Sequence, residues 1–412
     1  MVARTSGRGT LLVLGSGYQL GHERMLAQMA SEADVLLLNP EPVTWQARWV
    51  HDSAWFDPAS EGDVSLRAKE LVARREVSAV TTYEESMVVA AARLAAELGV
   101  PGVPVAAAEL ARDKHRQREL LNRTGISPTK SLLVNDLASA RRAAEEVGYP
   151  LIVKPRGLSG SAGVCRVDDP ADFDIAYETA ATVDKKGLDS EGVLIEEFLT
   201  GFEFDVDCWI VDGKATPVSW ARKIWDYDPY PIEAGFVIGE GALADPVTTA
   251  GFDLACRAVE AAGMDRTVAH VEVKMTPAGP RIIELNARPG GDIASRIVEL
   301  GRNVRLGSLL ALAALGGPLE SFPVRDRSAG IRFLYPKGRQ LFEGLAEAAE
   351  LRARPWIHEI RELRPHGDVV TAPPEDLWGR VGYVMATGSH ADEVVDRLTL
   401  ANHELTVLGP QV

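Results

Sequence analysis

The sequence is poor in cysteine and lacks any long hydrophobic run. Its 412 residues include three cysteines. They are odd in number and too widely spaced for a Cys-x-x-Cys metal motif, which also excludes a disulfide framework. The apolar run Leu11–Leu14 is too short for a secretory signal, and no stretch approaches the length of a membrane span. These absences predict a cytoplasmic protein that does not act in a membrane.

Positive charge is also scarce, with 44 Lys and Arg against 59 Asp and Glu and a net charge of −15. Nucleic acids and anionic membranes bind cationic surfaces, so neither is expected as a partner. The hydrophobic fraction of 46% is typical of a globular chain, and the length suggests two or three domains. Small molecules are therefore the expected partners, and a homodimer remains possible.

Residues 1–108 alternate short β-type runs with helical patterns, which predicts a parallel α/β domain. The expected strands and helices are Leu11–Leu14, Val35–Leu38 and Ala79–Thr82, and His22–Ala30, Leu66–Arg74 and Met87–Leu98. A tight strand-to-helix turn is expected at Gly15–Gly17, and a domain boundary at Gly99–Pro104.

The pattern changes over residues 109–320, where we expect a second domain with a mobile lid around 150–200. Its expected elements are helices Ala111–Arg123 and Leu137–Val147, a strand Leu151–Pro155 and a strand-like run ending at Leu199. Residues 321–412 predict a small α+β lobe, with strands at Ile331–Leu334 and Gly382–Met385 and a helix near 391–400.

The most informative segment is a predicted β-hairpin over Ala269–Gly291, with its turn at Ala278. Folding about Ala278 sets Glu272 opposite Glu284, and His270 opposite Asn286. These side chains share one face with Lys274 and Arg288, whereas the valines, Ile283 and Leu285 face the other way.

Two carboxylates set opposite each other repel unless a cation lies between them. Carboxylate and amide oxygens suit Mg²⁺ that carries phosphate, so Glu272, Glu284 and Asn286 are the predicted metal ligands. The alternative is a solvated polar strand face, which the strongly apolar opposite face makes less favourable.

A small-residue loop follows the strand that contains Lys154. Glycines let backbone N–H groups wrap an anion, serine hydroxyls add donors, and the lysine adds a point charge. The loop lacks the Gly-Lys-Ser/Thr ending of a Walker A motif. It predicts a phosphate cradle, with a flexible surface loop as the alternative. The predicted binding residues are Gly157, Ser159, Gly160, Ser161 and Gly163.

Two further segments carry weaker signals. The acidic run from Glu196 to Glu203 ends a strand, and Glu203 could hold ribose hydroxyls; alone it would indicate an edge strand with exposed acids. Residues 222–236 mix aromatics, acids and cations and predict a substrate-selecting loop, with Glu233 a partner for an α-ammonium. A Pro-bounded surface turn is an equal alternative. His270 either contacts substrate or is a hydrogen-bonded neighbour of the metal site.

Taken in order, these segments resemble the ATP-grasp carboxylate–amine ligases over essentially the whole chain. The motifs are Asp113-Lys114, Val153-Lys154-Pro155, the small-residue loop, Glu196-Glu197-Phe198-Leu199 with Gly201 and Glu203, and Glu272 with Glu284–Arg288. The hairpin, through Asp292, is most similar to the L-amino-acid ligases that form dipeptides. The resemblance implies an ATP-grasp fold with ATP and Mg²⁺ as cofactors.

The resemblance also implies roles for the matched residues. Lys114 and Lys154 would contact ATP phosphates, and the 157–163 loop would close over them. Glu197 and Leu199 would border the adenine, with Glu203 at the ribose and Glu196 and Phe198 also at the nucleotide. Arg288 would face the reacting carboxylate and, with Lys154, be catalytic, and Gly291 would be a further substrate contact.

The sequence therefore predicts an ATP-dependent ligase that joins an amino-acid carboxylate to an amine, most simply a second amino acid, through an acyl phosphate. One alternative is another ATP-grasp activity, of the purine-pathway or carboxylase type. Another is a binding protein without turnover, although the full charge set argues against it. The identity and order of the substrates are not predicted.

Overall fold

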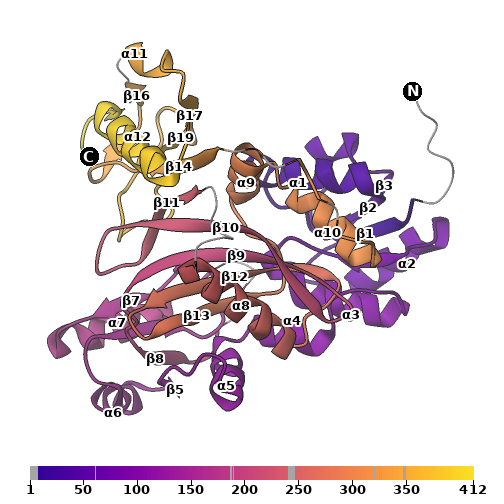
Figure 1. Ribbon diagram of the computed structural model, residues 1–412, viewed down its shortest axis with the longest axis horizontal. Helices are drawn as coiled ribbons and strands as arrows, with labels where there is room; N and C mark the ends of the chain where they lie inside the picture. The colour runs from indigo at the N-terminus through magenta and orange to yellow at the C-terminus, as the bar shows by residue number, and fades with distance from the viewer. Residues whose placement is uncertain are drawn as a thin grey trace.

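The computed structural model describes residues 8–412 apart from 61, 186, 187, 189, 240–245, 320, 324, 326, 347 and 348. The first seven residues of the predicted N-terminal domain, and three positions in the predicted lid, therefore lie outside the described residues. The described part contains a parallel sheet, a lid sheet and a large antiparallel sheet (Figure 1). None of its helices is both long and apolar enough to span a membrane.

The N-terminal region forms the predicted parallel sheet, in the order β3-β2-β1-β4. Sequence patterns located all of its strands except β3, which is short and only partly buried. Its elements are β1 (Thr10–Leu14), α1 (Gln19–Glu32), β2 (Asp34–Asn39), η1 (Trp45–Arg48), β3 (Asp52–Trp55), α2 (Asp63–Arg74), β4 (Ala79–Thr81), η2 (Glu85–Met87), α3 (Val88–Leu98) and α4 (Val105–Ala111). The turn at Gly15–Gly17 joins β1 to α1 as predicted, and both glycines have positive φ.

The predicted helix Ala111–Arg123 is wrong at its start. The chain breaks between α4 and α5 (Lys114–Thr124) because the Asp113 side chain accepts hydrogen bonds from the backbone N–H groups of His115 and Arg116. An aspartate in this position caps a new helix. Lys114 is therefore the first residue of α5 and has a fixed position.

A four-stranded lid sheet follows, in the order β5-β8-β6-β7. Its elements are β5 (Ser131–Val134), α6 (Leu137–Val147), β6 (Leu151–Pro155), β7 (Cys165–Val167), η3 (Pro170–Asp172), α7 (Phe173–Thr182) and β8 (Val193–Glu197). Helices α6 and α7 pack on one face of this sheet around a core of small and aromatic side chains. The other face is left for the site.

The central sheet has eight strands in the order β13-β12-β9-β10-β11-β14-β19-β17. Its first part contains β9 (Phe202–Val211), β10 (Lys214–Asp226), β11 (Ile232–Ile238), α8 (Pro246–Ala261), β12 (Thr267–Thr276) and β13 (Gly279–Asn286). Helix α8 covers the apolar face of the hairpin, while α9 (Ala294–Arg302) and α10 (Leu306–Leu315) pack against α1 of the N-terminal region (Figure 1).

The strands expected as a separate C-terminal lobe extend this same sheet, because β14 pairs antiparallel with β11. The elements here are β14 (Ser328–Leu334), β15 (Gln340–Leu341), β16 (Gly344–Ala346), α11 (Ala349–Arg352), β17 (Ile357–Glu362), β18 (Val369–Val370), β19 (Gly382–Gly388), α12 (Ala391–Glu404) and β20 (Thr406–Leu408). The boundaries at 108 and 320 remain predictions.

Candidate active site

The β12–β13 hairpin has the predicted register at its inner end. Glu272 pairs with Glu284, and His270 with Asn286. A β-bulge between Glu272 and Val273 then shifts the pairing by one residue, so that Val273 faces Ile282. The bulge sets the turn between Pro277 and Ala278 rather than on Ala278 itself.

The bulge also corrects the predicted position of Ile283. Ile282 is fully buried in the core beneath the hairpin, whereas Ile283 lines the open cavity on the polar face. An extra residue on one strand reverses the alternation of side chains locally. The carbonyls of Ile282 and Ile283 both accept hydrogen bonds from the Arg118 guanidinium of α5, which ties the bulge to the neighbouring helix.

A cavity of about 330 Å³ lies between the lid sheet and the central sheet. Most of the residues singled out from the sequence line it. They are Lys114, Lys154, Ser159, Gly160, Ser161, Glu196, Glu197, Phe198, Leu199, Glu203, Glu233, His270, Glu272, Glu284, Arg288 and Gly291. Gly157, Gly163 and Asn286 lie outside its lining. The cavity therefore gathers motifs that are far apart in the sequence.

Sequence reasoning missed the acids of β9 as a set. Glu203, Asp205 and Asp207 alternate with apolar residues on this strand, all three are buried, and all line the cavity. The alternation was a readable signal of a strand with one polar face. Because β9 lies between β10 and β12, the alternative of an exposed edge strand at Glu203 is wrong.

The missed residue Lys223 on β10 sits within this group of acids. Its Nζ lies 2.8 Å from Glu272 Oε1, 3.2 Å from Asp205 Oδ1 and 3.2 Å from Glu203 Oε1. Burial would lower the pKa of Lys223, but Asp205 and the neighbouring acids outweigh it and hold the pKa well above its usual value. One buried ammonium thus stabilises several carboxylates.

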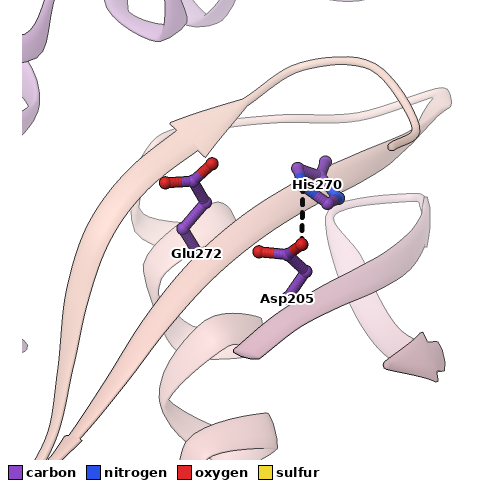
Figure 2. Close-up of side chains that lie close together, drawn as sticks. All are labelled: Asp205, His270 and Glu272. Atoms are coloured by element: carbon purple, nitrogen blue, oxygen red, sulfur yellow. Dashed lines mark ion pairs between the residues drawn. The ribbon is translucent and has the colours of Figure 1, made fainter. Parts of the chain in front are cut away.

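Figure 2 shows Asp205 of β9 with His270 and Glu272 of β12, whose ligand atoms lie within 4.8 Å of one another. This spacing could hold a metal ion, but the Lys223 ammonium already contacts both carboxylates. His270 Nε2 is 3.7 Å from Asp205 Oδ2 and its Nδ1 is 3.0 Å from Asp207 Oδ1. His270 therefore both lines the cavity and is held by hydrogen bonding.

The predicted ligands Glu284 and Asn286 have a different environment. Lys114 Nζ lies 3.1 Å from Glu284 Oε1. Asn286 is 3% exposed, and its Oδ1 has no hydrogen-bond partner among the described residues. A buried oxygen without a donor carries a desolvation cost that a cation would remove. The oxygen ligands of Glu272, Glu284 and Asn286 are of the type that Mg²⁺ prefers, although Lys223 also contacts Glu272. Their role as metal ligands stays a prediction.

Lys154 of β6 and Glu196 of β8 are both buried, on neighbouring strands of the lid sheet. Its Nζ lies 2.5 Å from Glu196 Oε2, and Arg118 Nε donates to Glu196 Oε1 at 2.8 Å. Burial would raise the pKa of Glu196, but Arg118 and Lys154 outweigh it and lower the pKa to about 2. Glu196 is therefore an ionised anchor for two cations.

Two lysines donate hydrogen bonds to the glycine loop. The Leu158 carbonyl accepts a hydrogen bond from Lys114 Nζ, and both the carbonyl and the hydroxyl of Ser159 accept from Lys185 Nζ. A Cβ on Gly160 would lie 2.5 Å from the Trp378 ring, and this glycine has φ of +65°. Only glycine allows the loop to lie this close to the C-terminal strands.

Near the predicted nucleotide side, Glu197 Oε1 accepts from the Lys130 backbone N–H, and Phe198 is stacked under Arg166 at 4.4 Å. Glu203, the predicted ribose ligand, lies 3.2 Å from Lys274 Nζ as well as contacting Lys223. The roles of Glu197 at the adenine and of Glu203 at the ribose stay predictions.

Arg288 lies just beyond β13 and reaches the N-terminal region. Its Nε is 2.5 Å from Glu85 Oε2, and its NH1 donates to the Pro289 carbonyl. Burial would raise the pKa of Glu85, but Arg288 and Arg112 outweigh it and lower the pKa to about 2. Glu85, which sequence analysis did not single out, orients the predicted catalytic arginine.

Residues 222–236 form the hairpin β10–β11 of the central sheet, so the predicted loop is wrong except for its short turn. Glu233 of β11 lies 3.6 Å from Lys223 Nζ. Burial raises the pKa of the Glu233 carboxyl above its usual value, although the nearby Lys223 ammonium acts to lower it. The cavity is also lined by Trp378 and Arg380, which sequence analysis did not single out, and by Asp292, which it included in the resemblance without a role.

Comparisons with known proteins agree with this geometry. Residues 147–297 match the ATP-grasp domain, and residues 332–408 match the L-amino acid ligase C-terminal domain 2. The crystal structure of an L-amino acid ligase from Bacillus licheniformis is similar with a TM-score of 0.84 and 20% identity, covering 99% of this chain and 100% of that one.

Among curated proteins, the alanine–anticapsin ligase of Bacillus amyloliquefaciens is 31% identical over 216 residues, which cover 48% of this chain and 45% of that protein. Carnosine synthase 1 of Gallus gallus is 28% identical over 322 residues, covering 72% and 34%. The chain spans about half the length of the alanine–anticapsin ligases. The chain therefore contains an ATP-grasp domain followed by an L-amino acid ligase C-terminal domain 2, and it has the ATP-grasp fold.

Proposed function

We propose that this protein is an ATP- and Mg²⁺-dependent ligase that forms an amide bond between the carboxylate of one amino acid and the amino group of another. The observation that supports this proposal most directly is that one cavity is lined by Lys114 and Lys154, by the acids of the hairpin and by Arg288. The similarity to alanine–anticapsin ligases and to an L-amino acid ligase fold supports this proposal.

In the first step, a substrate carboxylate oxygen attacks the γ-phosphorus of ATP, giving an acyl phosphate and ADP. Phosphoryl transfer needs alignment and charge neutralisation more than covalent help. Lys114 and Lys154 would supply positive charge to the phosphates, and the 157–163 loop would supply backbone N–H donors. Bound Mg²⁺ would neutralise the phosphate oxygens and be held by Glu272, Glu284 and Asn286.

In the second step, the amino group of the second substrate attacks the acyl carbon, and the carbon–oxygen bond to phosphate breaks. The products are an amide, inorganic phosphate and the proton lost by the amine. Arg288 suits the carboxylate first and the tetrahedral oxyanion afterwards, because its guanidinium can donate two parallel hydrogen bonds. Loop closure would exclude water, which would otherwise hydrolyse the acyl phosphate.

A phosphate-release screen with single and paired amino acids tests this proposal, with the products read by mass spectrometry. We expect phosphate and ADP in equal amounts with an amide whose mass is the sum of two amino acids minus water. Release that needs bicarbonate instead would favour a carboxylase-type reaction, and the absence of ADP in every mixture would contradict turnover.

A further inference from the structure

One pair of charges on the cavity wall has no part in the roles assigned above. Arg380 precedes β19 in the C-terminal strands, and Asp292 follows the Gly290-Gly291 turn. Both line the cavity, and the Arg380 NH1 group forms an ion pair with Asp292 Oδ2. The side chains are 12% and 26% exposed respectively, so both keep access to the open space.

The Arg380 guanidinium is held in a fixed plane. It stacks on the Phe333 ring at 3.5 Å, its Nε donates to the Tyr335 hydroxyl at 3.1 Å, and its NH2 donates to the Glu233 carbonyl at 3.3 Å. A guanidinium has five N–H donors, so these contacts leave donors over. A planar fork with free donors suits a carboxylate.

Asp292 is held independently of Arg380. Its Oδ1 accepts a hydrogen bond of 2.6 Å from the hydroxyl of Tyr18, a residue in the turn after β1. Its backbone has φ of +54°, a region that residues other than glycine rarely adopt. Tyr18 would therefore keep Asp292 in place after its Oδ2 parts from Arg380.

We propose that Arg380 and Asp292 form the binding site for the amine substrate and that this substrate is a zwitterionic α-amino acid. The substrate separates the ion pair: its carboxylate takes the place of Asp292 on Arg380, and its ammonium takes the place of Arg380 on Asp292. Charge on the wall stays balanced before and after binding. The inference rests on the proposed function and adds the residues that bind its second substrate.

The test compares L-amino acids with their carboxamides, which keep the ammonium and lose the carboxylate. We expect wild-type protein to favour the amino acid. Arg380→Gln should lower kcat/KM for the amino acid about tenfold to a hundredfold and leave the carboxamide near its wild-type value, because only the carboxylate uses the guanidinium. Asp292→Asn should impair both amines alike, and Arg380→Lys should recover only part of the preference.

Arg354→Gln is the matched control, since Arg354 pairs with Glu404 in the same C-terminal region and does not line the cavity. It should change neither amine. A structural role for Arg380 would lower kcat/KM for amino acid and carboxamide together, and that result overturns the proposal. So does a wild-type protein that uses both amines equally.

Calorimetry of the amino acids against the full chain with Mg²⁺ and a non-hydrolysable ATP analogue separates this inference from the proposed function. Amino-acid binding that Arg380→Gln weakens supports the binding site even if no amide forms. Amide formation whose amine preference ignores Arg380→Gln overturns the binding site and leaves the ligase activity standing.

Discussion

Glu284 is the residue at which the roles proposed for Lys114 and for Mg²⁺ meet. Lys114 Nζ lies 3.1 Å from its Oε1, and the register sets Glu272 directly opposite. A carboxylate held by a lysine from one side can still offer its other oxygen to a metal ion. The roles proposed for Lys114 and for Mg²⁺ are therefore compatible, and removing the Glu284 charge affects both.

Glu284→Gln should abolish ADP formation while the protein stays folded, because it removes one charge from the proposed cation site without changing side-chain size. The measurement is ADP release at saturating ATP and Mg²⁺, with the melting temperature recorded beside it. Glu362→Gln, at an exposed pair with His366, is the control and should have normal turnover. Near-normal ADP release by the Glu284 variant would refute the metal assignment.

Arg288 also differs from a simple point charge. Its Nε contacts Glu85 and its NH1 donates to the Pro289 carbonyl, so the orientation of the fork is set by neighbours from two regions. Lysine in its place would keep the charge but lose the fork.

Arg288→Lys should therefore leave ATP affinity unchanged and lower amide formation by orders of magnitude, since loss of a transition-state donor costs about 2.7–4 kcal/mol in comparable sites. Calorimetry gives the ATP affinity, and mass spectrometry gives the yield of amide. If a folded variant fails to bind ATP, Arg288 belongs to the nucleotide site; if the yield is full, it has no part in the reaction.

At the scale of elements, Arg118 of α5 joins the lid to the hairpin. It donates to Glu196 of β8 and to the carbonyls of Ile282 and Ile283 in the bulge of β13. Lys154 of β6 contacts the same carboxylate. Because Glu196 is 3% exposed, replacing its charge leaves two buried cations without their shared partner.

Glu196→Gln should lower the free energy of unfolding by about 3 kcal/mol at pH 7. Arg118 and Lys154 outweigh burial and lower the pKa of Glu196 from 4.5 to about 2. A depressed pKa adds stability that is complete above pH 4.5 and is lost as the pH falls through about 2. The difference between variant and wild type should therefore shrink on going from pH 4.5 towards pH 2.

Urea denaturation at several pH values between 7 and 3 measures this difference. Asp174→Asn, at an exposed pair with Arg141, serves as the control and should have little effect at any pH. A stability difference that stays constant across this range would show that the ionised form of Glu196 is not the stabilising species.

At the scale of the whole molecule, the C-terminal strands reach the site because they continue the central sheet. Strand β14 pairs with β11, which carries Glu233, and β19 pairs with β14 just beyond Arg380. The junction is tight at Gly235, where an added Cβ would lie 2.1 Å from the Ile331 carbonyl oxygen. The backbone contact leaves no flexible atom to move aside.

Gly235→Ala should therefore loosen the β11–β14 junction and cost about 1–3 kcal/mol of stability, as overpacking typically does. We expect faster hydrogen exchange in β14 and β19, with β1–β4 unaffected, and weaker amide formation. Gly317→Ala is the control, because this glycine also lacks a positive φ and the nearest atoms to its added Cβ, in Leu312, lie 3.4 Å away. Unchanged exchange in β14 would contradict the role of this junction.

The sequence by itself determined three of the four strands of the parallel N-terminal sheet, the register at the inner end of the β12–β13 hairpin, and candidate site residues most of which line the cavity. These features depend on side-chain periodicity and on turn residues, which act over a few positions. Glu272 and Glu284 could be paired because a hairpin is local, and Lys154 with its glycine loop could be located because strand and loop are adjacent.

Only the tertiary structure decided the rest. The bulge that turns Ile283 toward the cavity is hydrogen-bonded to Arg118 from a distant helix. Lys223 and Arg380 reach the cavity, and Glu85 reaches Arg288, from separate regions of the chain. Long-range charge pairing leaves no periodic trace in the sequence, since either partner reads as an ordinary surface residue until the fold buries it. The pairing of β14 with β11, which brings Arg380 to the site, is likewise a contact between strands distant in sequence.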